Sequence, residues 1–216
     1  MDNLSQRQCY LCHIQTTIST HSNISNNLLD FCLLNARSIR NKALLVKDYV
    51  VEHDIDVLAL TETWLDSSDK DDYYVSEICP TGYVFNHSSR VDLIGGGVGF
   101  LTKKHMRIKK QREMNFKSYE YLDLLISYRH GCIRVVTVYR PPPSKENDLK
   151  EQAIWNLRWE FHLKSFNLKQ HVSGRTHKNG NTLDLLITRC DDDLVTAVNI
   201  INPMLSILPS TVNWNS

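Results

Sequence analysis

The apolar positions in the first third of the chain follow a strand–helix–strand pattern. Residues 28–35 (LLDFCLLN) form an apolar run that predicts a β-strand ending in a polar residue. Residues 42–52 (KALLVKDYVVE) space their apolar side chains by three and four, which is typical of an amphipathic helix. Residues 55–61 (IDVLALT) predict a short buried strand. This order indicates a parallel strand pair joined by a helical crossover.

Two neighbouring apolar runs in the middle of the chain predict a β-hairpin. Residues 121–128 (YLDLLISY) and 132–139 (CIRVVTVY) flank a short loop that contains Gly131. Prolines 141–143 end the second strand because proline has no amide hydrogen to donate. Further elements are expected as a helix over residues 148–164 and as strands over residues 182–188 and 195–201. Hairpins combined with a crossover predict an α/β fold with mixed sheets.

Polar segments between these runs predict irregular structure. Residues 1–27 are rich in Asn, Ser, Thr and Gln without a clear period, so we expect an irregular extension. Residues 66–80 are acidic and polar and predict a loop, in which four aspartates are expected to be solvated: Asp66, Asp69, Asp71 and Asp72. Residues 95–97 are glycines that predict a tight turn into a strand. A phosphate-binding loop is disfavoured because the Gly-Lys-Ser/Thr ending is absent.

Composition adds few constraints. The 216 residues carry 25 basic and 24 acidic side chains, and a net charge of +1 neither supports nor excludes binding to DNA. The basic segment 103–112 predicts either a contact to the DNA backbone or a lysine-protected edge strand. We expect no membrane span and no signal peptide. The six cysteines are expected to be reduced, and Cys32, Cys132 and Cys190 to be buried. The Cys9–His13 pattern is too short to indicate haem or zinc.

Four short segments, in this order, resemble one family. They are residues 34–38 (LNARS), 60–65 (LTETWL), 138–142 (VYRPP), and 176–177 (TH) followed by 180–185 (GNTLDL). The sequence resembles the apurinic-type endonuclease domain of non-LTR (LINE-type) retrotransposons, within the endonuclease/exonuclease/phosphatase superfamily. The resemblance implies a four-layer α/β/β/α sandwich of two mixed sheets. It also implies Mg²⁺-dependent nicking of DNA and a reverse transcriptase domain that normally lies in the same polyprotein but is absent here. An intracellular location, with the nucleus as the compartment that fits the family, goes with this resemblance.

The resemblance also assigns roles to individual residues. It implies four catalytic residues, Asn35, Glu62, Tyr139 and Asp184, with Glu62 as the metal ligand. It implies three residues that contact the substrate, Arg140, Thr176 and His177. This chemistry is reasonable, because phosphodiester hydrolysis needs a cation and donors to the phosphate, and one or two carboxylates suffice to hold Mg²⁺. Each residue also has a purely structural alternative. Glu62 can be an ordinary loop carboxylate, and Asn35 can cap the end of its strand. Tyr139 can be a core tyrosine, and His177 can be a solvated loop histidine.

Two family motifs are absent from the sequence. No Gly-Asp-x-Asn occurs between residues 143 and 166, and the final Ser-Asp-His is replaced by a sequence that diverges after Ser206. We therefore expect a domain over residues 28–206 that is truncated between 143 and 166 and lacks a central strand. Residues 207–216 are expected to be an unrelated tail, and Asp184 to lack its histidine. Loss of the residue that handles water and of the histidine predicts impaired catalysis and weak Mg²⁺ binding.

Two other functions stay open at this point. The chain can be a noncatalytic retroelement remnant, with or without affinity for DNA. It can also be a relative that hydrolyses a small phosphoester or a lipid headgroup, although the ETWL and YRPP segments favour the retroelement branch.

Overall fold

The computed structural model describes residues 11–17, 28–66, 68–89, 95–115, 120–128, 131–139, 164–165, 167–172, 187–190 and 195–201. The predicted loss of a central strand, the helix over 148–164 and the tail over 207–216 all concern residues outside these ranges, apart from the last residue of that helix.

A six-stranded mixed sheet forms the centre of the described fold, in the order β11-β1-β2-β3-β5-β4. Its strands are β1 (Leu11–Thr17), β2 (Leu28–Asn35), β3 (Val57–Thr61), β4 (Tyr83–Ser88), β5 (Val98–Lys103) and β11 (Val195–Ile201). Strands β2 and β3 are parallel and are connected through helix α1 (Ala43–Glu52). The crossover predicted from the sequence is therefore confirmed.

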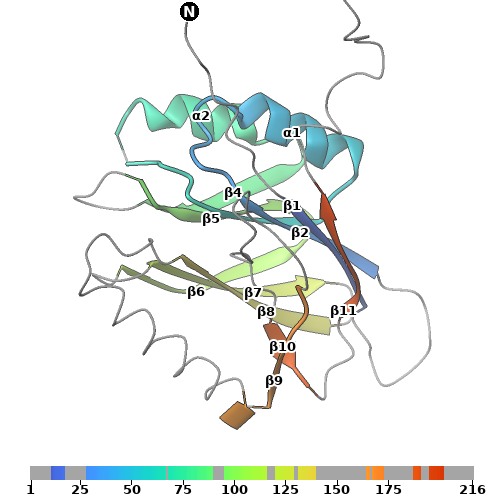
Figure 1. Cartoon of the computed structure of the whole chain (residues 1–216). Helices are drawn as coiled ribbons and strands as arrows, with labels where there is room; N and C mark the ends of the chain where they lie inside the picture. The colour runs from blue at the N-terminus through green and yellow to red at the C-terminus, as the bar shows by residue number, and fades with distance from the viewer. Residues whose placement is uncertain are drawn as a thin grey trace, which may run out of the picture.

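A second sheet lies against the first one (Figure 1). It contains β6 (Arg107–Asn115), β7 (Glu120–Tyr128) and β8 (Gly131–Tyr139), all antiparallel. The β7–β8 pair is the predicted hairpin, and β6 places most of the basic segment on an edge strand. The short strands β9 (Leu168–Gln170) and β10 (Ile187–Arg189) form a separate antiparallel pair.

Two cores hold three layers together. Helices α1 and α2 (Asp71–Ile78) cover the outer face of the six-stranded sheet (Figure 1). Strand β3 is buried on both faces: Leu58 and Leu60 belong to the core beneath the helices, and Val57 and Ala59 to the core between the sheets. The mixed α/β class with several sheets agrees with the sequence-based expectation, and the fourth layer stays a prediction.

Two polar segments were predicted wrongly. Residues 11–17, expected to be irregular, form β1, because β2 and β11 pair with both of its edges and supply order that no local pattern shows. Residues 71–78, expected to be loop, form α2. Asp71 and Asp72 favour a helix start because their negative charges oppose the helix dipole, and Ile78 anchors the other end in the core.

The cysteine predictions had mixed outcomes. Cys32 is a free, buried thiol as expected, whereas Cys190, which directly follows the short strand β10, is exposed. The side chain of Cys132 lies outside the described set. Within the described part of the chain, no helix is long and apolar enough to cross a membrane.

Candidate functional site

The parallel strands β2 and β3 end side by side and bring two predicted site residues together. Asn35 is in register with Thr61, the residue before Glu62. The Asn35 amide Nδ2 donates to Glu62 Oε1 at 2.9 Å, and both side chains are partly buried. Asn35 Oδ1 in turn accepts the backbone N–H of Arg37 at 3.2 Å. The sequence predicted both residues, and the sheet places them at one edge because parallel strands end on the same side.

The loops that follow these strands adopt an uncommon backbone conformation. Arg37, Ser38, Glu62 and Trp64 have φ values of 45°, 78°, 54° and 60°, which L residues rarely adopt. Three backbone hydrogen bonds join the loop after β2 to the loop after β3. Ala36 N–H donates to Thr61 O at 2.8 Å, Ser38 N–H to Glu62 O at 2.8 Å, and Ile39 N–H to Thr63 O at 3.1 Å. Backbone strain of this kind persists only where surrounding structure enforces it, and it gathers at functional sites.

A glycine turn supports the Glu62 loop from its other side. Thr63 N–H donates to Gly97 O at 3.2 Å, and Trp64 N–H donates to Gly96 O at 2.8 Å. Gly97 has a φ of +85°, and a Cβ there would lie 2.2 Å from Thr63 Oγ1. Only glycine fits so close an approach. The predicted turn into a strand is confirmed. Its carbonyl oxygens bind the backbone of the loop that carries Glu62.

The second sheet reaches this turn through a buried carboxylate. Glu120 is 2% exposed, and its Oε2 accepts the N–H of Gly97 at 2.5 Å. Its register partner across the β7–β8 hairpin is Tyr139, which packs against the core between the sheets. Tyr139 therefore connects to the Glu62 loop through Glu120 and Gly97. Nothing in the sequence pattern singled out Glu120, since an acidic residue that begins a strand is usually exposed.

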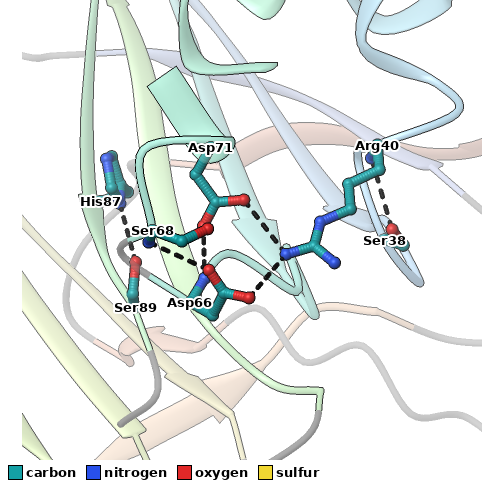
Figure 2. Close-up of polar contacts among 7 residues, drawn as sticks. All are labelled: Ser38, Arg40, Asp66, Ser68, Asp71, His87 and Ser89. Carbon is teal, nitrogen blue, oxygen red and sulfur yellow. Dashed lines mark hydrogen bonds and ion pairs between the residues drawn. The ribbon is translucent and has the colours of Figure 1, made fainter. Parts of the chain in front are cut away.

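An ion-pair cluster joins the two loops at their far ends (Figure 2). Arg40 Nη2 donates to Asp66 Oδ2 at 2.9 Å and to Asp71 Oδ1 at 3.1 Å. Asp71 Oδ2 also accepts the backbone N–H of Asp66 at 2.5 Å. The expectation of solvated aspartates is wrong for Asp71, whose side chain is 3% exposed. Its burial follows from its partners, because a buried carboxylate needs a cation and donors.

The cluster shifts the titration of its exposed members. Hydrogen bonds from Ser68 and then from Arg40 hold the pKa of Asp66 well below its usual range. The hydrogen bond to Asp66 and that to Asp71 raise the pKa of Arg40 against the opposing effect of burial. Both side chains are therefore charged at neutral pH.

The Lys42 side chain stabilises the loop that follows Asn35 by binding two of its carbonyl oxygens. Its Nζ donates to Ala36 O at 2.5 Å and to Arg37 O at 3.1 Å. This edge of the sheet thus combines one partly exposed carboxylate with two cations, Arg37 and Lys42. Such a set suits an anionic ester, because the cations attract the phosphate and the carboxylate is available to a metal ion.

The donor set at this edge fits Mg²⁺. Glu62 supplies a partly exposed carboxylate at a strand end, and Mg²⁺ retains several waters and needs only one or two carboxylates. The described residues contain no group of three or more His, Cys, Asp or Glu side chains able to hold a metal.

Four predicted site residues lie outside the described ranges, namely Arg140, Thr176, His177 and Asp184. His171 is a described residue that shortly precedes Thr176 and His177 in the sequence. Its Nε2 lies 2.7 Å from Thr188 Oγ1, and burial followed by the charge of Lys169 lowers its pKa. His171 is therefore a neutral hydrogen-bonding residue at neutral pH.

Comparison with protein families identifies one match. A family model described as "Endonuclease/Exonuclease/phosphatase family" matches residues 25–172. No curated protein matches the sequence.

Solved structures of TDP2 resemble part of the chain. TDP2 from D. rerio, humanized by 14 mutations, has 17% identity over 58% of this chain and 50% of that chain, at a TM-score of 0.39. D. rerio TDP2 complexed with a single-strand DNA product has 14% identity over 57% and 48%, at 0.39. Truncated Caenorhabditis elegans TDP2 has 15% identity over 62% and 55%, at 0.35. The chain spans about half the length of these structures.

Proposed function

This chain belongs to the endonuclease/exonuclease/phosphatase family, and on that premise we propose that it is a Mg²⁺-dependent DNA endonuclease domain of the non-LTR retrotransposon type, impaired in this copy. The observation that carries the proposal is the Asn35–Glu62 pair at the ends of two adjacent parallel strands. A reverse transcriptase in the same polyprotein and a nuclear location belong to the same proposal.

Each described residue has a chemical task in this proposal. Glu62 would hold Mg²⁺, which offsets the charge of the phosphate when bound. Asn35 fixes the rotamer of Glu62 through its 2.9 Å hydrogen bond. Tyr139 would donate its phenol hydrogen to a nonbridging oxygen, and Arg37 adds positive charge at the same edge. Asn35 and Tyr139 therefore order the site, and Glu62 provides its negative charge.

The remaining assignments rest on the sequence motifs. Arg140, Thr176 and His177 would contact DNA, and Asp184 would orient a histidine that this sequence does not contain. The absent Gly-Asp-x-Asn motif would have supplied the groups that handle water. Each missing acid–base group lowers turnover by about 10²- to 10⁴-fold, so nicking should fall below detection.

The test uses the full chain, supercoiled plasmid and Mg²⁺, with Glu62→Gln and the exposed control Glu52→Gln. We expect no nicking above the plasmid background. Titration with Mn²⁺, which also prefers oxygen ligands, should show weak binding by the wild type and by Glu52→Gln, and a loss of that binding in Glu62→Gln. Nicking that depends on Glu62 would overturn the proposed impairment, and cation binding that does not need Glu62 would overturn the proposed site.

The noncatalytic alternative gives a different result in the same samples. A noncatalytic remnant that binds DNA would do so without cleaving it and independently of Glu62. If it binds, the affinity should fall steeply with salt because the contacts are to phosphates.

A further inference from the structure

The Arg40–Asp66–Asp71 cluster lies at the end of the loops that carry the candidate site (Figure 2). Arg40 stands in the loop that begins after Asn35, and Asp66 follows Glu62 along the other loop. The two loops are joined at one end by the Asn35–Glu62 hydrogen bond and at the other by Arg40. Three backbone hydrogen bonds lie between these ends.

We propose that Arg40 and Asp71 are positioning residues that hold Glu62 in its left-handed backbone conformation. This inference rests on the proposed function for the meaning of metal binding at Glu62. Asp71 begins helix α2, which is anchored in the core through Ile78. Its carboxylate fixes the backbone of Asp66 directly and the side chain of Arg40 beside it. A helix fixed in the core is thereby coupled to a strained loop.

The burial of the partners separates this cluster from an ordinary surface ion pair. Exposed pairs contribute little because solvent and side-chain entropy cancel their attraction. Here the side chain of Asp71 is 3% exposed, while those of Arg40 and Asp66 are 37% and 54% exposed. The contact between Arg40 and Asp71 is therefore the one that solvent screens less. Asp66 connects this contact to the loop because Asp71 also binds the Asp66 amide.

The cluster has a second attachment within the Asn35 loop. The N–H of Arg40 donates to Ser38 Oγ at 3.3 Å, and Ser38 itself has a φ of 78°. Ser38 N–H donates to the carbonyl oxygen of Glu62 at 2.8 Å. A displacement of Arg40 is therefore transmitted to Glu62 through Ser38 as well as through Asp66.

Neutralising each of the two opposite charges separates positioning from simple electrostatics. If the cluster acted only through its charge, Arg40→Gln would strengthen cation binding at Glu62, and Asp71→Asn would weaken it. If the cluster positions Glu62, both substitutions weaken binding. Groups that orient a metal ligand typically change affinity by about 10- to 100-fold, so we expect a loss of about tenfold in each variant.

The experiment titrates the full chain with MnCl₂ and follows free Mn²⁺ by electron paramagnetic resonance. The matched control is Asp72→Asn, because Asp72 is the exposed neighbour of Asp71 and lies in the same first turn of α2. Asp72→Asn removes a comparable interaction with the helix dipole but leaves the contacts of Asp71 to Arg40 and Asp66 in place. The cation affinity of this control should therefore stay within about twofold of the wild type. Opposite shifts for Arg40→Gln and Asp71→Asn would overturn the proposal, as would unchanged affinity in both.

Amide hydrogen exchange distinguishes this proposal from the proposed function. The amides of Ser38 and Thr63 should exchange at least about tenfold faster in Arg40→Gln and Asp71→Asn, with the amides inside β3 unchanged. If Glu62→Gln leaves Mn²⁺ binding intact, the proposed function fails, and the exchange rates alone decide whether the cluster holds the loop. Unchanged rates, or equal acceleration throughout β3, would refute positioning.

Discussion

The two ends of strand β3 carry carboxylates in opposite situations. Asp56 precedes the strand and is 6% exposed, and its oxygens accept bonds from Asp30 N–H at 3.0 Å and from Lys103 Nζ at 2.9 Å. Glu62 follows the strand, is partly exposed, and has a φ of 54°. Asp56 is buried between two donors, whereas Glu62 lies on strained backbone with its carboxylate within reach of solvent.

This difference separates a stabilising carboxylate from one suited to ligand binding. At the Asp56 end, the carboxylate joins β2, β3 and β5, and Tyr83 OH adds a bond to Ile55 O at 2.8 Å. At the Glu62 end, the surrounding loops enforce strain, which costs about 1–3 kcal/mol for each such residue. Strain of this kind often accompanies functional sites. Substitutions at the Glu62 end should therefore report on backbone strain, and substitutions at the Asp56 end on lost hydrogen bonds.

The largest expected effect breaks the support of the Glu62 loop. Gly97→Ala should lower the free energy of unfolding by about 3 kcal/mol, because it adds positive-φ strain and a clash with the buried Thr63. Gly82→Ala is the matched control, since Gly82 has a φ of +90° and nothing within 4 Å of a new Cβ. It should lose only about 1 kcal/mol. Urea unfolding followed by tryptophan fluorescence measures both, and equal losses would show that the close approach to Thr63 is unimportant.

The next largest effect concerns the end of β3 that carries Asp56. Asp56→Asn should cost about 2 kcal/mol, because it removes the charge of a buried acceptor that faces a partly buried lysine. Asp54→Asn is the control, since Asp54 also pairs with Lys103 at 2.8 Å but its side chain is 89% exposed. Its loss should stay below about 0.5 kcal/mol. Similar losses in urea unfolding would contradict the special role given to Asp56.

At the strained end, the size of the expected change depends on the replacement. Glu62→Gly should be about 1 kcal/mol more stable than Glu62→Ala, because glycine adopts a φ of 54° without steric cost. Both variants lose the carboxylate and its bond to Asn35, so their difference isolates the backbone. Thermal and urea unfolding provide the measurement. Equal stability of the two variants would mean that the loop relaxes and stores no strain.

The smallest effect is a pH dependence that belongs to the Asp56 end. Burial lowers the pKa of Lys103, but hydrogen bonds to Asp54 and Asp56 outweigh it and raise that pKa from 10.5 to about 12. A raised pKa in the folded state contributes stability that is present below pH 10.5 and is lost as the pH rises through about 12.

Since its partner Asp54 is 89% exposed, screening by solvent should reduce this contribution to about 0.5 kcal/mol. The wild type and the exposed control Lys104→Met should therefore lose more stability between pH 10 and about 12 than Lys103→Met does. If the free energy of unfolding falls equally with pH in all three proteins, Lys103 does not contribute to the pH dependence.

Local patterns predicted the elements that carry strong periodicity. The strand 28–35, the helix that follows it, the parallel strand 55–61 and the hairpin over 121–139 all occur in the structure. The same reasoning failed for β1 and α2. Strand β1 depends on pairing with β11, which lies far away in the sequence, and α2 is too short and polar for its period to stand out.

The sequence by itself determined that Asn35 ends one apolar strand, that Glu62 follows another, and that a helix connects those strands. That was enough to place both side chains at one sheet edge, because parallel strands end together. The tertiary structure alone decided that Glu62 adopts a left-handed backbone, that Asp71 is buried against Arg40, and that Glu120 reaches Gly97. Each of these features depends on contacts between segments distant in the sequence, which no local pattern of residues encodes.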